Sequence, residues 1–556
     1  MCNSRDAIIK RATEDAIRKL KAKTPKPTRE EIVDTVFNDT RDQIALENAG
    51  NGKSMSLSGI SNLVPYQIAR CIAEFELVKC IRYTQEATEL EREPIGVYQE
   101  DGPDEGIYAT DALSLKRLVR KYNYTINKYE MEEVENILRA ELPHVARTTD
   151  RDLICVNNGV VNYRTKELLP FSPDMVFTSK CRVDYDPMAR NVVIHNDEDG
   201  TDWDVESWME GLSKDPEVVN VLWQILGAII RPNVAWNKSA WFYATSGNNG
   251  KGTLCALMRN LCGEGTHASI KLSDFSKDFI LEPLLHASAI IVDENDVGLF
   301  IDKVANLKAV ITNDVIQINR KFKAPIDFQF KGFMVQCLNE FPRIKDKSNS
   351  LYRRQLIIEF TECFTGHERR YIKDDYLKRP EVLQYVLKRV VTMPDYYALT
   401  EPASCKNVLE NYKSFNDPVR LFCEEVMSQC VWDLLPYDFL YDLYRAWFKK
   451  ANPSGSVQGK NTFMEDIRQY VTNNDTGWAY PGKGQDGKER QIRSAGKGMD
   501  QPEPLIVEYD LKDWMNKTYP GSNPTRLSMT TPKTRYRGLV RLSAADSIDE
   551  GGEDDA

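Results

Sequence analysis

The chain has 556 residues, of which 42% are hydrophobic and 28% charged, so most of it should fold into several globular units. It has no apolar run long enough to cross a bilayer and no signal-peptide pattern at its N-terminus, and we expect a cytoplasmic protein without a membrane partner. The net charge of −10 disfavours a protein that coats nucleic acid over its whole surface. The 12 cysteines form no CxxC pair and the five histidines are scattered, which disfavours a disulfide framework and a zinc site.

Acidic residues are concentrated in the tail at 544–556, which contains six of them and no basic residue. Removing these six charges changes the net charge from −10 to −4. A motor that encloses DNA needs positive charge only along its channel, so this balance is compatible with DNA binding. The composition of the tail cannot form a core, and we predict that it is disordered.

Residues 1–55 are polar and helix-prone, which predicts a helical N-terminal extension. A mixed α+β domain is expected over 56–200. This domain contains two helical patterns and two runs typical of extended chain, at 115–121, 128–140, 153–161 and 175–183. Helical patterns return over 203–230, at the start of the next predicted domain, 201–400.

Strands and helices alternate between residues 239 and 360, which is the pattern of an α/β layer fold. A helical pattern then extends over 408–450, with breaks expected at Pro418 and Pro436. The last folded domain is expected over 401–543, before the tail.

A loop that binds phosphate is predicted between the apolar strand at 239–244 and an apolar helix that begins near Leu254. Glycine lets backbone N–H groups turn towards an anion, and the helix N-terminus adds partial positive charge. Lys251 would reach the β and γ phosphates of a nucleotide. The expected nucleotide-binding residues are Ser246, Gly247, Asn248, Asn249, Gly250, Lys251, Gly252 and Thr253.

This loop departs from the pattern GxxxxGK[ST] at two positions. Thr245 stands where glycine is expected, and Gly252 stands where a hydroxyl is expected. The hydroxyl follows one residue later at Thr253, which is therefore a candidate magnesium ligand. A glycine-rich turn with a solvated lysine is the alternative for the loop taken alone.

Two carboxylates end the apolar run at 289–292, and the first, Asp293, follows Lys251 by about forty residues, a usual separation in phosphate-loop motors. Asp293 would hold magnesium, and Glu294 would orient and polarise the attacking water. The alternative is a strand that ends in a solvated acidic turn.

A third apolar strand is predicted to end at Asn339, whose amide would contact the γ-phosphate or position water. Arg353 and Arg354 then precede the apolar strand at 355–360. Adjacent arginines suit a finger that completes a neighbouring subunit's ATP site and a sensor residue. A basic surface pair is the alternative.

Alternation around Ala324 and Pro325 predicts a β-hairpin that turns there. Its tip is expected to carry Arg320, Lys321 and Lys323, together with Phe322. Basic charge beside an aromatic ring suits a nucleic-acid strand, although a solvated hairpin fits the same residues.

The order of these motifs resembles the superfamily 3 helicases, in the branch of the phage and plasmid primases and the poxvirus primase-helicases. Four upstream segments support the resemblance, at 158–160, 171–173, 185–189 and 222–227. The resemblance extends over roughly residues 56–542. It implies an AAA+-type P-loop ATPase core of the α/β class, with a mixed α+β collar before it and a winged-helix domain after it.

By this resemblance, ATP and Mg²⁺ are the cofactors, and the ATPase roles fall to Lys251, Asp293, Glu294, Asn339, Arg353 and Arg354. Arg320, Lys321 and Lys323 take the DNA-binding role. The family implies a homo-oligomeric ring, a hexamer, that moves 3′ to 5′ on single-stranded or forked DNA with other replication proteins. For a phage or plasmid protein, the location would be the host bacterial cytoplasm. Only a short helical stretch precedes residue 56, so primer synthesis is not expected.

The C-terminal domain contains a basic stretch without an acidic residue, at 526–541. Its bases are Arg526, Lys533, Arg535, Arg537 and Arg541. A basic wing suits backbone phosphates, and a solvated strand that balances the acidic tail is the alternative.

Two other functions fit the same residues. In the first, ATP binding assembles a DNA-binding initiator or loading scaffold that unwinds little or no DNA. The second, more remote, is a motor that packages duplex DNA, although the sequence offers no clear nuclease carboxylate cluster. ATPase activity with and without single-stranded DNA distinguishes the first of these from a helicase.

Overall fold

The computed structural model describes residues 4–50, 56–84, 90–321, 323–451, 457–484 and 487–543. The chain divides into two compact units, Met1–Leu409 and Glu410–Ala556. The predicted acidic tail at 544–556 lies outside the described residues. Among the helices described, none has the length and apolar content to span a membrane.

The N-terminal extension is helical, as predicted, and forms α1 (Arg5–Lys21) and α2 (Arg29–Gly50). These helices share one apolar core with α3 (Pro65–Phe75), α4 (Ala112–Tyr122) and α5 (Lys128–Glu141). A four-stranded sheet adjoins them in the order β3-β2-β1-β4. Its strands are β1 (Val78–Arg82), β2 (Ile95–Tyr98), β3 (Tyr108–Ala109) and β4 (His144–Ala146).

The predicted extended run at 153–161 is a hairpin of β5 (Leu153–Val156) and β6 (Gly159–Asn162), which turns at Asn157 and Asn158. The second predicted run, 175–183, is not a strand. Its backbone N–H groups bond to separate places, such as Cys181 to the carbonyl of Cys155 and Arg182 to that of Leu261. A ladder needs one continuous partner, so no strand forms there. Three further short strands follow β6: β7 (Leu168–Leu169), β8 (Ile194–Asn196) and β9 (Thr201–Trp203).

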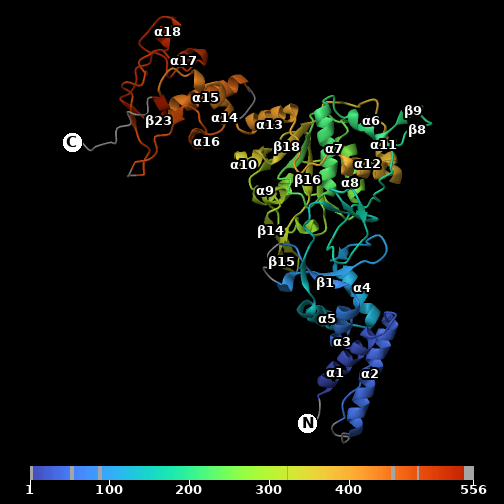
Figure 1. Cartoon of the computed structure of the whole chain (residues 1–556). Helices are drawn as coiled ribbons and strands as arrows, with labels where there is room; N and C mark the ends of the chain where they lie inside the picture. Colours follow the sequence, from blue (N-terminus) through green and yellow to red (C-terminus); the bar gives the residue numbers. More distant parts are fainter. Residues whose placement is uncertain are drawn as a thin grey trace. The chain divides into compact units, whose positions relative to one another are not determined.

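A five-stranded parallel sheet forms the centre of the α/β part, in the order β11-β12-β16-β10-β18 (Figure 1). The strands are β10 (Ser239–Tyr243), β11 (His267–Ala268), β12 (Ala289–Val292), β16 (Phe333–Leu338) and β18 (Gln355–Glu359). All residues of β12 and β16 are buried, which explains the apolar run of β12 and the mostly apolar run of β16, where Gln336 is the one polar residue.

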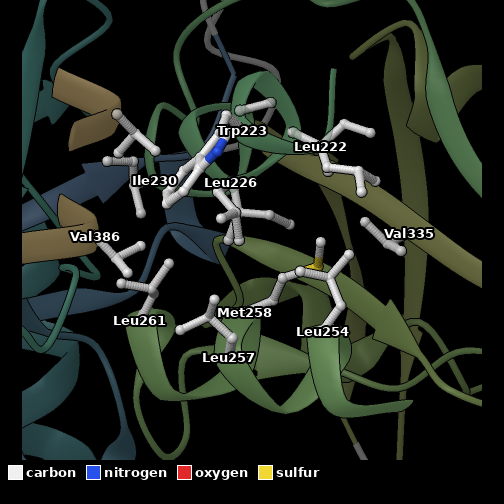
Figure 2. Packing of buried hydrophobic residues seen from close by; sticks show 14 of the residues in the cluster. Leu222, Trp223, Leu226, Ile230, Leu254, Leu257, Met258, Leu261, Val335 and Val386 are labelled. Atoms are coloured by element: carbon white, nitrogen blue, oxygen red, sulfur yellow. The ribbon is translucent and has the colours of Figure 1, made fainter. Parts of the chain in front are cut away.

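Helices α7 (Pro216–Ile230), α8 (Lys251–Cys262) and α12 (Pro380–Thr392) pack together against this sheet. Asp215 caps α7 and Pro216 takes its first position, a favourable helix start. Figure 2 shows side chains of α7, such as Leu226, and of α8, such as Leu257, pointing towards one another. This packing fixes the start of α8 relative to the sheet.

The remaining elements of the first unit surround this core. They are α6 (Val205–Glu210), β13 (Phe300–Ile301), α9 (Ala305–Ile311), β14 (Val315–Arg320), β15 (Lys323–Gln329), β17 (Arg343–Ile344), α10 (Asn349–Tyr352) and α11 (Arg370–Asp374). Helix α13 (Ala403–Asn416) follows and contains the division between the two units.

The second unit has its own apolar core, which includes Phe422, Trp432, Leu443 and Phe463. Its helices are α14 (Pro418–Glu425), α15 (Tyr437–Ala451), α16 (Lys460–Asn473), α17 (Leu505–Glu508) and α18 (Pro524–Leu527). A three-stranded sheet has the order β19-β23-β20, and β21 pairs with β22. These strands are β19 (Leu434–Pro436), β20 (Trp478–Ala479), β21 (Ile492–Arg493), β22 (Arg535–Tyr536) and β23 (Gly538–Arg541).

Candidate functional site

The predicted motifs meet at one edge of the parallel sheet. Strands β12, β16 and β10 are adjacent and parallel, so their carboxyl ends lie side by side. The phosphate loop follows β10, Asp293 and Glu294 follow β12, and Asn339 follows β16. Open α/β sheets bind ligands at this edge, and three segments far apart in the sequence are brought together there.

The phosphate loop is held in a fixed shape by its own residues. Gly250 precedes α8 with a φ of 85°, and a Cβ atom there would lie 2.6 Å from Cδ2 of Leu212. Asn248 also has a positive φ, 53°. The buried amide of Asn249 donates a hydrogen bond to the carbonyl of Ser246. Position 250 therefore requires glycine, and the loop leads directly into the N-terminus of α8.

Lys251 is the first residue of α8, and only 6% of it is exposed. Its ammonium group donates to Oδ1 of Asn339 at 3.0 Å and to the carbonyl of Leu338 at 3.2 Å. Burial lowers the pKa of Lys251 from its ordinary value. These acceptors are neutral, so they orient the cation without cancelling its charge, and it can still attract a phosphate.

The two departures from the loop pattern have structural explanations. Positive φ values in the loop fall on Asn248 and Gly250, so Thr245 adopts a backbone conformation that does not need glycine. A Cβ atom on Gly252 would meet nothing within 4 Å. The backbone thus leaves space for a side chain at 252, and the hydroxyl group comes instead from Thr253, which is half-buried.

The carboxylate of Asp293 lies at the end of β12 and forms an ion pair with the guanidinium of Arg259 in α8. The two N–O distances are 3.0 and 3.1 Å. Arg259 lowers the pKa of Asp293, so this carboxylate is ionised near neutral pH. Glu294 is exposed beside it. No sequence motif indicates Arg259, because its contact with Asp293 comes from the packing of α8 against the sheet.

Asn295 is a second residue that the sequence motifs do not include. It anchors the segment that follows β12. Its buried amide donates to Oε1 of Gln336 at 2.9 Å and to the carbonyl of Cys337 at 3.0 Å. Its side-chain oxygen accepts from the backbone of Leu272 at 3.0 Å. These bonds hold the Asp293–Glu294 segment against β16. In the sequence, the role of Asn295 is indicated only by its place as a polar residue directly after two acidic ones.

A cavity of about 880 Å³ adjoins the phosphate loop. Asn248, Gly250 and Thr253 line one side of it, and Trp208 and Phe364 contribute aromatic rings. The segment after β18 also contacts the loop directly. The backbone N–H of Phe364 donates to the carbonyl of Asn248 at 2.8 Å, and the amide of Asn248 donates to Glu368 at 2.8 Å. A partly aromatic cavity of this size beside the predicted phosphate loop has a size and lining that suit a nucleoside.

Arg353 and Arg354 lie away from this edge. They precede β18, which is parallel to β10, and the carbonyl of Arg354 accepts from the backbone of Ser239 at the start of β10. Both arginines therefore lie at the opposite, amino edge of the sheet. Arg354, which follows α10, donates to the hydroxyl of Ser350 in that helix at 2.7 Å, whereas Arg353 is exposed. The sequence does not distinguish these two arginines, whereas the structure distinguishes them by exposure and hydrogen bonding.

The predicted hairpin is present as β14 and β15, but its turn was misplaced. β14 ends at Arg320 and β15 begins at Lys323, so Ala324 and Pro325 lie inside β15. The register shifts between Ile318 and Arg320, next to the proline. Proline is tolerated at such an irregularity because no ladder hydrogen bond from its nitrogen is needed there.

The three predicted hairpin cations lie at the tip but are not equivalent. Lys321 and Lys323 are exposed. Arg320 is half-buried, and its guanidinium donates twice to the carbonyl of Ala324, at 2.8 and 3.0 Å. Arg320 thus closes the tip, and the two lysines present the accessible charge. Phe322 lies outside the described residues.

The cations in the basic stretch of the second unit also differ in their partners and exposure. Arg541 forms an ion pair with Asp433 at 2.8 Å, and Arg526 lies over the ring of Tyr519. Lys533, Arg535 and Arg537 are exposed. Arg535 pairs across the β21–β22 ladder with Arg493, which is also exposed and lies outside the predicted stretch. Two like charges directly opposite one another destabilise a strand pair unless an anion binds near them.

No cluster of three or more potential metal ligands occurs among His, Cys, Asp and Glu in the part of the chain that the structure describes. Magnesium does not require such a cluster, because it is usually bound by one or two carboxylates, waters and substrate phosphates. Asp293 supplies an ionised carboxylate beside the phosphate loop, and Thr253 supplies a hydroxyl at the same end of α8. This donor set fits magnesium bound together with a nucleotide.

Three family models match separate parts of the chain. The D5 N-terminal-like family matches residues 66–212, and the poxvirus D5 protein-like family matches residues 414–491. Between them, residues 242–354 match a family of unknown function, DUF5906. This middle match contains the phosphate loop, both carboxylates, the hairpin and Asn339.

Among solved structures, the chain is similar to the apo C-terminal region of NrS-1, with 12% identity and a TM-score of 0.40 over 73% of this chain and 86% of that one. A second form of the NrS-1 region has 13% identity and a TM-score of 0.38, over 73% and 88%. No curated protein matches the chain. The two D5 matches, which flank the motif-containing segment on both sides, confirm the resemblance to the poxvirus and phage branch of the superfamily 3 helicases.

Proposed function

We propose that this chain is the subunit of an ATP-driven replicative DNA helicase that assembles as a ring. One observation carries the proposal: Lys251, Asn339 and the Asp293–Glu294 pair converge at the carboxyl edge of one parallel sheet. A lysine at a helix N-terminus beside an ionised carboxylate and a free glutamate is an arrangement suited to phosphoryl transfer.

Each residue at this edge has a distinct task in hydrolysis. Lys251, held by Asn339 and the carbonyl of Leu338, would neutralise charge on the β and γ phosphates. Glu294 would accept a proton from the attacking water, since it is exposed next to Asp293. Asn339, which accepts a hydrogen bond from Lys251, would contact the γ-phosphate and link its presence to the position of β16.

Asp293 and Thr253 are the residues that would hold Mg²⁺, and the ion would add positive charge to the phosphates when bound. Asp293 would need to divide its oxygens between the metal and Arg259, its present partner. The nucleoside would occupy the cavity of about 880 Å³ next to the loop, where Trp208 and Phe364 can contact a base.

The position of the arginines supports a ring. Arg353 lies at the amino edge of the sheet, so it cannot reach the phosphate loop of its own subunit without crossing the length of the strands. In a head-to-tail ring it would complete the ATP site of the neighbouring subunit. The family resemblance favours a hexamer with an AAA+-type core over 201–400. Arg354 would act as a positioning residue for α10, through its bond to Ser350.

DNA contact is proposed at two places. Lys321 and Lys323, at the tip of the β14–β15 hairpin, would hold a phosphate of single-stranded DNA and drive 3′ to 5′ movement. The C-terminal segment 401–543, proposed to be a winged-helix domain, would bind backbone phosphates through Arg493 and Arg535. Residues 56–200 would form the collar, with 1–55 as a helical extension.

ATP hydrolysis by the purified full-length chain tests this proposal when it is measured with and without single-stranded DNA, beside unwinding of a forked duplex. We expect hydrolysis that DNA stimulates, unwinding from the 3′ side, and loss of both in Lys251→Ala. Hydrolysis or ATP-dependent assembly without unwinding would instead favour a loading scaffold. A folded chain that neither binds nor hydrolyses ATP would overturn the assignment of the site.

A further inference from the structure

The β14–β15 hairpin is attached to the N-terminal sheet through one cation and two aromatic rings. Arg147 follows β4, and Tyr83 follows β1. These strands are parallel neighbours, with Arg82 opposite Ala146, so Tyr83 and Arg147 emerge side by side at their carboxyl ends. Figure 1 shows the hairpin next to β1. The joint therefore connects segments that match two different families, 66–212 and 242–354.

Arg147 bridges the two segments by hydrogen bonds. Its Nη2 atom donates to the carbonyl of Tyr83 at 3.1 Å and to the carbonyl of Gln329, in β15, at 2.8 Å. The guanidinium also lies 5.0 Å from the ring centre of Tyr83 and 5.1 Å from that of Phe328. The guanidinium of Arg147 thus donates to one carbonyl in each segment and lies over both rings. The planar shape of this group suits such an arrangement.

The two rings complete the joint. Tyr83 and Phe328 meet edge to face with centres 5.1 Å apart, and both residues are almost fully buried. The hydroxyl of Tyr83 donates to Thr110 at 3.0 Å, which fixes the ring from the N-terminal side. Phe328 lies opposite Ile316 in the hairpin ladder, so the contact holds both strands of the hairpin.

A second contact lies closer to the tip. Arg92 donates to the carbonyl of Pro325 at 3.2 Å. At the base, Gln329 donates to the carbonyl of Asn313 at 2.8 Å. The hairpin is therefore held at its base by its own domain and along β15 by the N-terminal segment, whereas Lys321 and Lys323 at its end are exposed. A strand pair held at these points can transmit a small rotation of the N-terminal sheet to its tip.

We propose that Arg147 is a positioning residue through which the N-terminal segment sets the place of the DNA-contacting hairpin, and so the coupling of ATP hydrolysis to DNA. This inference rests on the proposed function of the hairpin. Arg147 touches neither the ATP site nor DNA. Arg147 acts through its contacts with Tyr83 and β15. The N-terminal segment then takes part in coupling ATP hydrolysis to DNA, in addition to supporting the ring.

The test uses Arg147→Met, which keeps much of the side-chain volume and removes the charge, in the full-length chain. Arg151→Met is the matched control, because the guanidinium of Arg151 lies over the ring of Tyr397, which is not part of the hairpin. Hydrogen exchange over 315–329 is measured together with ATP hydrolysis with and without single-stranded DNA. We expect exchange in the hairpin to rise by about tenfold, as local opening becomes easier. DNA stimulation of hydrolysis should fall severalfold while DNA-free hydrolysis is kept.

Arg147→Lys separates positioning from general stability. Lysine keeps a cation that can donate to carbonyls and interact with the rings, so it should restore part of the DNA stimulation. Unchanged hairpin exchange in folded Arg147→Met overturns the inference. So does raised exchange with normal DNA stimulation, provided that replacing Lys321 and Lys323 with alanine still abolishes stimulation. If that lysine replacement has no effect on DNA stimulation, the proposed function of the hairpin itself has failed, and this result is distinct from the other two.

Discussion

The phosphate loop and the β14–β15 hairpin both present lysines, in opposite environments. Lys251 is 6% exposed and bound to three acceptors, among them Asn339. Lys321 and Lys323 are exposed at the end of a two-stranded hairpin. A cation held in one place suits a group that always binds in the same geometry, such as a nucleotide phosphate. A mobile, solvated cation suits a DNA phosphate that is exchanged at each step.

Replacing Lys251 should have the largest effect, because it removes the fixed cation. Lys251→Ala is expected to lower ATP hydrolysis by at least roughly 100- to 1,000-fold, the usual cost of losing one preorganised charge at a transition state. Steady-state ATPase assays on folded protein measure this. Wild-type hydrolysis in this variant would mean that the buried Lys251 does not bind a nucleotide phosphate, and the contrast with the exposed hairpin lysines would then have no functional meaning.

Glu294→Gln should separate nucleotide binding from hydrolysis at the same edge. An amide cannot accept the proton of the attacking water, so hydrolysis should fall by about 100-fold or more while ATP binding remains. Nucleotide-binding titration and ATPase rates give the two quantities. Glu264→Gln, in the exposed turn after α8, is the control and should change neither. Loss of ATP binding in Glu294→Gln would assign a structural role to this carboxylate.

The two arginines, which both lie at the amino edge of the sheet, can be compared with one another. Arg353→Ala should abolish most hydrolysis, because its exposed side chain is the one available to a neighbouring subunit. Arg354→Ala should act mainly on the stability of α10, since Arg354 is bound to Ser350. ATPase activity and thermal unfolding of each variant distinguish the two effects.

Mixed rings test whether Arg353 acts across the subunit boundary. Arg353→Ala and Lys251→Ala subunits each lack a different half of a shared site, so mixing them should restore part of the activity. Restored hydrolysis in co-assembled subunits supports a trans finger. No recovery in rings shown to contain both subunits would place Arg353 outside the ATP site.

The sequence predicted the strand, loop and helix around Lys251, the strand before Asp293 and the strand before Asn339 correctly, because each of these signals is local. The partners that position them could not be predicted. Arg259 meets Asp293 across 34 residues, and Arg147 meets Gln329 across 182. Such contacts depend on how helices and sheets pack, and a single sequence contains no periodic sign of them.

The misplaced hairpin turn has a related cause. Proline was interpreted as a turn residue, which is its usual role. In β15, Pro325 lies next to a register shift, and its carbonyl accepts from Arg92 of the N-terminal segment. The register shift removes the need for a ladder hydrogen bond from the proline nitrogen, so this strand position accepts proline, and local propensity predicted the wrong turn.

The hairpin lysines should show an intermediate effect. Replacing Lys321 and Lys323 with alanine removes two exposed charges and leaves every ATP-site residue in place. DNA stimulation of hydrolysis and fork unwinding should fall severalfold, and the salt dependence of DNA binding should flatten. Replacing Lys116 and Lys121 of α4 with alanine removes the same charge elsewhere and is the control. Normal unwinding by the hairpin variant would leave the second unit as the main DNA contact.

The smallest effect is expected at Arg493 and Arg535, which compare the hairpin with the second basic surface. These residues are cross-strand neighbours in β21 and β22, and their mutual repulsion is relieved when a phosphate binds between them. Replacing both with alanine should weaken duplex and fork binding by about twofold at low salt, and less at high salt. It should also stabilise the second unit slightly against unfolding, because the repulsion is gone. Replacing Arg526 with alanine is the control, since that side chain lies over Tyr519. Weaker stability together with unchanged DNA affinity would identify the arginine pair as a packing feature of the strands, and the exposed lysines of the hairpin would then carry the DNA contact alone.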